Sequence, residues 1–376
     1  MPLQIDSETQ GVVSLDYYEF DVKERYFRLK SSKLKEISVR IPYLLNPLCD
    51  YNSNDYLLFL MKNSLQAENH IFQLFEAHIE DRIGWVFPIQ SLVSDSHSFF
   101  DNDHFLKYAF VAFYKLCTND CNVRSNIVTF NRAKSEYELL DFYEHDDVVV
   151  IISKQKIASI PEFNITNYMP SLFKFGYCIV TANNYGQNYY NSQEDAYREV
   201  SSQFAIRQTS EVLKKDVYIN ELFQSILQTE SHPLVRFLLL YQVIEVLIEN
   251  IFQREVDNCC NELKAFQNGS PTVFHKLREK LIELAQEKRR INKLFIVGTY
   301  IKEKVERDGL KQACQELIKA VNPDGQPSDD FTECFYTTRS LIVHEYRRIA
   351  GRFEELIKKI NLEFEKVVIA LVISFK

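Results

Sequence analysis

The feature that most constrains this fold is a change of sequence pattern near residue 190. Before it, apolar residues come in short runs bounded by polar ones, whereas after it they recur at helical spacing almost without interruption. Only 9 Gly and 10 Pro occur among 376 residues, which leaves little material for long linkers. We therefore predict an α+β protein, with a β-rich or mixed domain over residues 1–190 and a helical domain over 191–376.

Strand signals dominate the first half. Ile37, Val39 and Ile41 alternate with polar neighbours, as in a half-buried strand. Further apolar or aromatic runs that we interpret as strands cover residues 56–61, 108–116, 148–152 and 177–180. Residues 67–79 have helical spacing instead and could form a helix.

The second half reads as a series of helices after a polar, aromatic segment at residues 183–191. This segment places the domain boundary between residues 183 and 213. Ser192 can cap a first helix, and Ser231 can cap another that has Pro233 in its first turn. The remaining predicted helices cover residues 213–229, 271–292, 301–321, 331–348 (capped by Asp329 or Asp330) and 353–376.

Charge and hydropathy exclude several protein classes. The net charge of −8 argues against a surface that binds nucleic acid broadly, so any such contact needs a local basic patch. The N-terminus lacks the basic and apolar regions of a signal peptide. The longest apolar runs, 237–241 and 367–373, are far shorter than the roughly 20 residues that cross a bilayer. We expect a soluble, cytoplasmic protein without a membrane partner.

Metal binding is not favoured by the pattern of potential ligands. Cys117 and Cys121 are close together, but no second pair follows at zinc-finger spacing, so free thiols are the favoured interpretation. A second group of histidines and aspartates has irregular, loop-like intervals, and we interpret it as solvated: His97, His104, His145, Asp101, Asp103, Asp146 and Asp147. No metal and no cofactor are predicted.

One short motif carries candidate chemistry. Residues 338–348 read TRSLIVHEYRR, in which four residues separate Arg339 from His344 and Tyr346 follows after one more. Histidine is suited to proton transfer near neutral pH, and arginine presents a permanently charged, planar fork to a phosphate. Since RNA supplies its own nucleophile, the 2′-hydroxyl, this pair could cleave RNA without a metal.

The motif resembles that of the HEPN superfamily, whose ribonuclease members are helical bundles with an Arg-x4-His sequence on a late helix. The resemblance covers residues 213–376, and the earlier helix with Tyr241 and Glu245 is also similar to abortive-infection HEPN proteins. It implies catalytic roles for Arg339 and His344. The implied activity is that of a metal-independent endoribonuclease effector, a toxin or an antiviral defence protein, regulated by its N-terminal domain.

Two further residues of the motif receive supporting roles from the same resemblance. Ser340 occupies the polar position after the arginine, and Tyr346 matches a tyrosine that a partner nucleotidyltransferase modifies. Because tyrosine has a pKa near 10, it is a poor base at neutral pH, so Tyr346 is predicted to be regulatory. A phage-derived trigger is the other partner that the resemblance suggests.

Helix geometry complicates the catalytic pair. A step of five residues turns a straight helix by about 140°, so Arg339 and His344 would not share a face. The apolar stripe of this helix consists of Phe331, Phe335, Thr338, Ile342 and Ile349. Either the helix is distorted, or two copies of the motif meet across a two-fold axis. We expect the second arrangement, a homodimer through the C-terminal helices.

The remaining candidates have two interpretations each. Glu245 could orient Arg339 or pair with any cation of the bundle. The basic residues that could track an RNA backbone, but could equally be solvated helix ends, are Lys288, Arg289, Arg290, Lys293, Arg347 and Arg348.

Two other functions stay open at this point. One is a HEPN module that binds a nucleotide or a partner and dimerises without cleaving RNA. The other places the activity in residues 1–190, and it ranks last because that part has neither a Gly-rich phosphate loop nor a nucleophile elbow.

Overall fold

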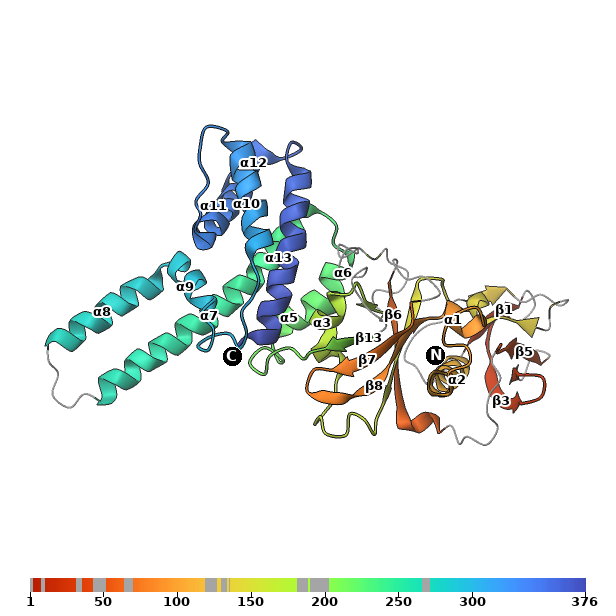
Figure 1. Cartoon of the computed structure of the whole chain (residues 1–376). Coiled ribbons are helices and arrows are strands. Elements are labelled where there is room, and N and C mark those ends of the chain that lie inside the picture. The colour runs from red at the N-terminus through yellow and green to blue at the C-terminus, as the bar shows by residue number, and fades with distance from the viewer. Residues whose placement is uncertain are drawn as a thin grey trace. The chain divides into compact units, whose positions relative to one another are not determined.

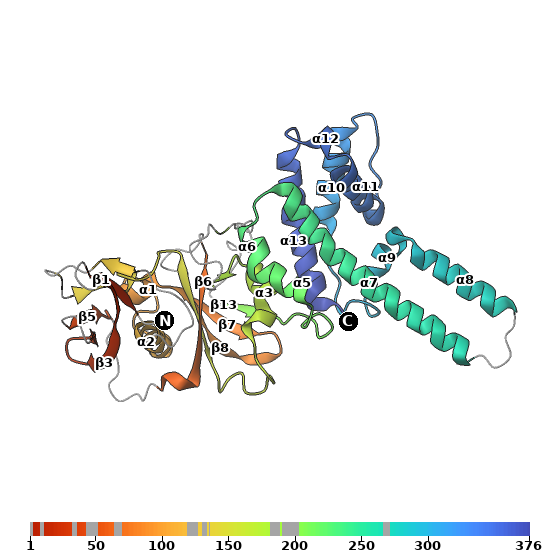
Figure 2. The ribbon, with the colours of Figure 1, turned by 180° about the vertical axis from the view of Figure 1, so that it is seen from behind.

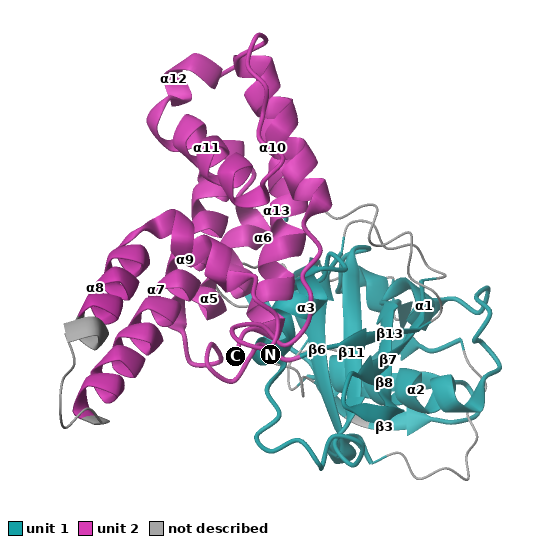
Figure 3. Ribbon diagram, turned by 60° about the vertical axis from the view of Figure 1, so that its left-hand side comes forward, with its two compact units in different colours: residues 1–207 teal, residues 208–376 magenta. Residues whose placement is uncertain are grey.

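The computed structural model describes residues 3–7, 11–31, 36–42, 52–63, 70–118, 127–129, 134, 136–180, 189, 203–265 and 271–376. The chain divides into two compact units, residues 1–207 and 208–376 (Figure 3). Strands occupy the first unit and helices the second, so the predicted α+β class is confirmed. Among the described residues, no helix is long and apolar enough to cross a membrane.

The first unit is built on a six-stranded sheet, within the described residues, of order β12-β6-β11-β8-β7-β13. Adjacent strands of this sheet are antiparallel, except that β13 runs parallel to β7. The strands are β6 (Tyr56–Lys62), β7 (Phe72–Glu76), β8 (Ile79–Pro88), β11 (Asp147–Ser153), β12 (Cys178–Ile179) and β13 (Gln203–Ile206). All seven residues of β11 are buried, as expected for a central strand.

Two smaller sheets complete the strands that the structure describes. One has the order β2-β1-β9 and the other β10-β5-β4-β3. Their strands are β1 (Gln4–Ser7), β2 (Gly11–Ser14), β3 (Asp16–Asp21), β4 (Tyr26–Lys30), β5 (Ile37–Arg40), β9 (Ile127–Thr129) and β10 (Glu136–Tyr137).

Helix α2 (Asp103–Thr118) lies between the six-stranded sheet and the four-stranded sheet (Figures 1 and 2). One hydrophobic core joins the helix to both sheets, with Phe27 of β4 stacked on Phe113 of α2 and Trp85 of β8 packed edge-on against Phe105. Shorter helices of the unit are η1 (Ser53–Asp55), α1 (Gln90–Val93), η2 (Leu139–Asp141), η3 (Ile165–Tyr168) and α3 (Met169–Phe173).

Two local predictions for this unit are wrong. Residues 108–116 belong to α2, not to a strand, because a helix between two sheets is apolar on most of its surface and its sequence then resembles a buried strand. Residues 72–76, predicted as helix, form β7, which pairs with β8 through a turn at Ala77 and His78. The strands predicted at residues 37–41, 56–61, 148–152 and 177–180 are confirmed.

Strand β13 belongs to the first unit and places the division after residue 207, within the predicted range of 183 to 213. It adds an edge to the six-stranded sheet through its pairing with β7, so the second unit begins at Gln208 and not at residue 191. The helix expected after Ser192 lies outside the described residues.

The second unit is mainly helical in its described residues. Its segments are α5 (Val217–Glu221), the π-helical turn η4 (Leu222–Ile226), α6 (Leu227–Thr229), α7 (Pro233–Ala265), α8 (Pro271–Ala285), α9 (Glu287–Leu294), α10 (Asp308–Val321), α11 (Phe331–His344), α12 (Tyr346–Ile349) and α13 (Glu354–Ser374). Helices α7, α10, α11 and α13 form a bundle, and the end of α7 continues beside α8 as an antiparallel arm (Figure 2).

A buried ion pair joins two of the bundle helices. Arg236 of α7 donates from Nε to Oε1 of Glu365 of α13 over 2.5 Å, and both side chains are almost fully buried. Arg236 also donates to the backbone oxygens of Leu227 and Glu230, at the end of α6. The guanidinium of Arg236 thus connects α7 to α13 and to the end of α6.

Two helix boundaries differ from those expected. The helix predicted from residue 301 begins at Asp308, since Ile301 forms β-bridges with Val297 and Phe375. The helix predicted over residues 331–348 ends at His344, and a separate short helix, α12, follows. This second difference places His344 at the C-terminal end of α11 and Tyr346 at the start of α12.

Candidate active site

Helix α11 carries the motif and is fixed at its start by a side-chain cap. Of the two expected candidates it is Asp330 that caps, accepting a hydrogen bond from the backbone N–H of Glu333 over 2.8 Å. The predicted apolar stripe is buried: Phe331, Phe335, Thr338, Ile342 and Ile349 are at most 6% exposed. Packing of this stripe directs the opposite side of α11 away from the core.

The two motif residues are in contact near the C-terminal end of α11. Glu345 has φ −117° and ψ 22°, outside helical geometry, so the chain turns directly after His344. Nη1 of Arg339 and Nε2 of His344 are 3.0 Å apart within one chain. A second chain is therefore not needed to pair them, because the long side chain of Arg339 spans the angle between the two positions on the helix.

The direction of this hydrogen bond is set by chemistry. A guanidinium has only donors, so Nε2 of His344 must be the acceptor and therefore carries no proton. The imidazole is then neutral, with its proton on Nδ1. His344 is exposed, and the pair is thus within reach of a ligand from solvent.

An aromatic ring from a distant helix supports the arginine. The guanidinium carbon of Arg339 lies 5.3 Å from the centre of the Tyr241 ring of α7, a distance typical of cation–π contacts. The hydroxyl of Tyr241 donates to Oε1 of Glu287, the first residue of α9, over 2.5 Å. Burial and the Glu287 carboxylate raise the pKa of Tyr241, so the ring stays a neutral phenol.

The other residues assigned to the motif have fewer contacts. Glu245 is exposed and makes no hydrogen bond or ion pair with Arg339. Ser340 is half-buried on α11. Tyr346 is half-buried and begins α12, the short helix that follows α11.

The expected RNA-contacting cations fall into two groups. Lys288 pairs with Glu333, Arg290 with Glu249, Lys293 with Glu255 and Arg348 with Glu345, which leaves these charges partly neutralised. Among the residues that the structure describes, the exposed Arg289 and Arg347 form no ion pair. These two are the cations most available to a phosphate backbone.

The expected solvated group is only partly solvated. His104, Asp101 and Asp103 are exposed, but His97 is buried, with Nε2 3.1 Å from the backbone oxygen of Ser91. Within the described part of the chain, no group of three or more His, Cys, Asp or Glu residues could hold a metal ion. Cys117 is a buried free thiol, and Cys121 lies outside the described residues.

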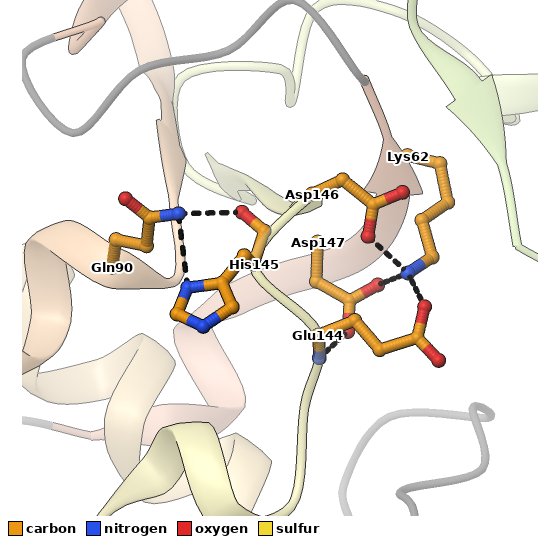
Figure 4. Close-up of polar contacts among 6 residues, drawn as sticks. All are labelled: Lys62, Gln90, Glu144, His145, Asp146 and Asp147. Carbon is orange, nitrogen blue, oxygen red and sulfur yellow. Dashed lines mark hydrogen bonds and ion pairs between the residues drawn. The ribbon is translucent and has the colours of Figure 1, made fainter.

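A second polar cluster lies in the first unit and was missed from the sequence. Figure 4 shows Lys62, at the end of β6, with its ammonium group facing three carboxylates. The Nζ atom is 2.5 Å from Glu144, 2.6 Å from Asp146 and 2.8 Å from Asp147. Burial raises the pKa of Asp147 from 3.8 to about 6, against the opposing effect of Lys62. The three carboxylates likewise raise the pKa of Lys62, against its own burial.

The sequence does not show that these four residues lie together. Asp147 is opposite Lys62 in the antiparallel pairing of β11 with β6, a register that no pattern in a single sequence reveals. All three carboxylates contact the ammonium group of Lys62, so the cluster joins the end of β6 to the start of β11.

Comparison of the chain with models of protein families, with curated proteins and with solved structures found no match. The assignment of a function therefore depends on the geometry of the Arg339 and His344 pair.

Proposed function

We propose that this protein is a metal-independent endoribonuclease whose catalytic residues are Arg339 and His344. The observation that carries the proposal is the 3.0 Å contact between Nη1 of Arg339 and Nε2 of His344 in one exposed site. A fixed cation and an unprotonated imidazole within one contact distance are the two groups that cleavage of RNA at its own 2′-hydroxyl requires.

The chemistry can be written with these two side chains alone. The 2′-hydroxyl of the RNA replaces Arg339 as the hydrogen-bond donor to Nε2 of His344. The imidazole then accepts the proton of this hydroxyl, while the 2′-oxygen attacks the adjacent phosphorus. The bond from phosphorus to the 5′-oxygen breaks, and that oxygen takes a proton from the imidazolium. Arg339 stabilises the charge that develops on the non-bridging oxygens. The products are a 2′,3′-cyclic phosphate and a 5′-hydroxyl.

The donors of Arg339 favour this role. Its Nε is buried without a hydrogen-bond partner, and no described residue accepts from Nη2. An unpaired donor on a cation is costly unless a ligand satisfies it, and a phosphate oxygen is a suitable acceptor. Arg289 and Arg347 would add contacts to the RNA backbone.

The wider role follows from the sequence resemblance. As part of the proposal, the protein acts in the cytoplasm as a toxin or antiviral effector, and residues 1–207 respond to a trigger such as a phage component. A homodimer through the C-terminal helices would then hold two complete sites, since each chain already pairs its own Arg339 and His344.

Expression in a bacterial host tests the nuclease. We expect the wild type to arrest growth and fragment RNA, and Arg339→Ala and His344→Ala to lose both effects. Arg40→Ala and His104→Ala, exposed residues of the first unit, are matched controls that should retain them. A chain that binds RNA or a partner without fragmenting RNA would instead identify a non-catalytic module.

Tyr346 is proposed as the regulatory position of this site. A nucleotidyl group on its hydroxyl would bring bulk and negative charge to α12, directly after His344. Tyr346→Phe should keep the cleavage rate but no longer be modified by a partner nucleotidyltransferase. Loss of cleavage in this variant would show that the tyrosine takes part in the reaction.

A further inference from the structure

Tyr241 is held from several sides in the core of the helical unit. Its ring stacks on Phe237 with centres 6.1 Å apart, contacts Phe335 at 5.8 Å and is only 3% exposed. The guanidinium carbon of Arg339 also contacts this ring, 5.3 Å from its centre. Close packing fixes the position of the Tyr241 ring, so the ring can act as a rigid support for the guanidinium of Arg339.

The hydroxyl of the same tyrosine is anchored to another helix. It donates to Glu287 over 2.5 Å, and this carboxylate begins α9, where the helix dipole favours a negative charge. Ion pairs hold α9 in turn, from Lys288 to Glu333 of α11 and from Lys293 to Glu255 of α7. The tyrosine therefore couples α7, α9 and α11 at the position of Arg339.

Arg339 is supported by a neutral ring and not by a carboxylate, which affects how much of its charge is available. Arginines in proteins are commonly fixed by a carboxylate, which would neutralise the guanidinium and compete with a phosphate. No described carboxylate pairs with Arg339, and Glu287 binds the tyrosine hydroxyl instead. A neutral ring orients the guanidinium while its full positive charge stays available.

We propose that Tyr241 is a positioning residue for Arg339, with Glu287 as its anchor. The inference rests on the proposed nuclease function and deepens it. The ring holds the guanidinium so that Nη1 faces His344 and Nη2 faces the incoming RNA phosphate. Because the transition state carries more charge than bound RNA, loss of the ring should lower kcat and change KM little.

The test compares tyrosine variants of the full-length protein. Tyr241→Phe keeps the ring, and its kcat on a single-stranded RNA oligonucleotide should stay within about threefold of the wild type. Tyr241→Leu removes the ring and should lower kcat by about 10- to 100-fold. Tyr300→Leu is the matched control, because Tyr300 is also buried and also donates its hydroxyl to a glutamate, Glu255. Its kcat should equal that of the wild type.

A second readout does not depend on catalysis. In nuclear magnetic resonance spectra, the Nε–Hε signal of Arg339 should be shifted by the ring in the wild type and in Tyr241→Phe. It should move to an ordinary position in Tyr241→Leu and stay unchanged in Tyr300→Leu. If the wild type cleaves no RNA, the nuclease proposal fails, and this signal alone still decides whether Tyr241 orients Arg339.

Three results would overturn the inference, two of them kinetic. One is a kcat of Tyr241→Leu equal to that of the wild type. The other is an equal loss of kcat in Tyr241→Leu and Tyr300→Leu, which would reveal a general effect on the fold. The third is an Nε–Hε signal of Arg339 with the same chemical shift in Tyr241→Leu as in the wild type, which would show that the ring does not orient Arg339.

Discussion

The hydrogen bond from Arg339 to His344 couples charge and proton transfer in a single pair of side chains. The guanidinium occupies the lone pair of Nε2, which is the atom that would accept a proton from RNA. A phosphate that attracts the guanidinium would therefore also free the base. Protonation of His344 would place two cations side by side, so the contact belongs to the neutral imidazole.

Loss of Lys62 should destabilise the first unit strongly. Lys62→Met would leave the buried Asp147 beside two further carboxylates without a cation. We expect a loss of about 3 kcal/mol in the free energy of unfolding, at the low end for a broken buried pair because Glu144 and Asp146 are half-exposed. Urea unfolding followed by the fluorescence of Trp85, the only tryptophan and part of the same sheet, measures this loss. The exposed Lys154 provides a control, Lys154→Met, without effect.

The same cluster gives a pH dependence with a defined sign. Because burial raises the pKa of Asp147 from 3.8 to about 6, the folded state keeps this proton where the unfolded chain has lost it. Stability from this group therefore falls as the pH rises from about 4 to about 6. Without Lys62 the window should move to higher pH, so acidification from pH 7 to pH 6 should partly rescue Lys62→Met. Further destabilisation of the variant over that interval would contradict the assigned charges.

At the scale of elements, regular patterns were predictable and their interruptions were not. The alternation at Ile37 and Val39 and the helical spacing of α13 were sufficient to identify a strand and a helix. Helix α2 was not recognised, since a helix buried on two sides lacks the polar face that distinguishes it from a strand.

The end of α11 shows why the site geometry could not be derived from the sequence. Residues 344–346 contain neither Gly nor Pro, and the turn at Glu345 carries no local sequence signal. The identities of Arg339 and His344 could be read from the motif, but their contact depends on side-chain conformations that the sequence does not reveal. Tyr241 and Glu287 could not be assigned to Arg339, because their proximity arises only from the packing of α7 and α9 on α11.

The cap of α11 is a prediction at this scale. Asp330→Ala removes the acceptor for the backbone N–H of Glu333 and should destabilise the helical unit by about 1 kcal/mol. The amide of Glu333 should also exchange faster with solvent. Asp329→Ala is the neighbouring control, since that side chain is fully exposed and caps nothing, so equal effects of the two changes would disprove the assigned cap.

At the scale of the whole molecule, all groups of the proposed site belong to the second unit. Arg339, His344, Tyr241 and Glu287 lie within residues 208–376, and the Lys62 cluster lies within residues 1–207. The proposed site and the Lys62 cluster therefore belong to different units of the chain.

Completeness of the site in one chain leads to a prediction about mixtures. Inactive Arg339→Ala and His344→Ala proteins, mixed in equal amounts under conditions that exchange subunits, should not regain RNA cleavage. The reason is that each chain lacks one member of its own pair. Recovery of cleavage in the mixture would indicate that two chains share a site, and a mass measurement in solution would identify the oligomer responsible.

The most direct test of the central claim is RNA cleavage by the purified full-length protein in the presence of a metal chelator. We predict that it cleaves a single-stranded RNA to products with 2′,3′-cyclic phosphate and 5′-hydroxyl ends, and leaves DNA of the same sequence intact. Arg339→Ala and His344→Ala should each lower the rate by about 100-fold or more. Cleavage that requires a divalent metal, or that persists in both variants, would contradict the assignment of Arg339 and His344 as the catalytic pair.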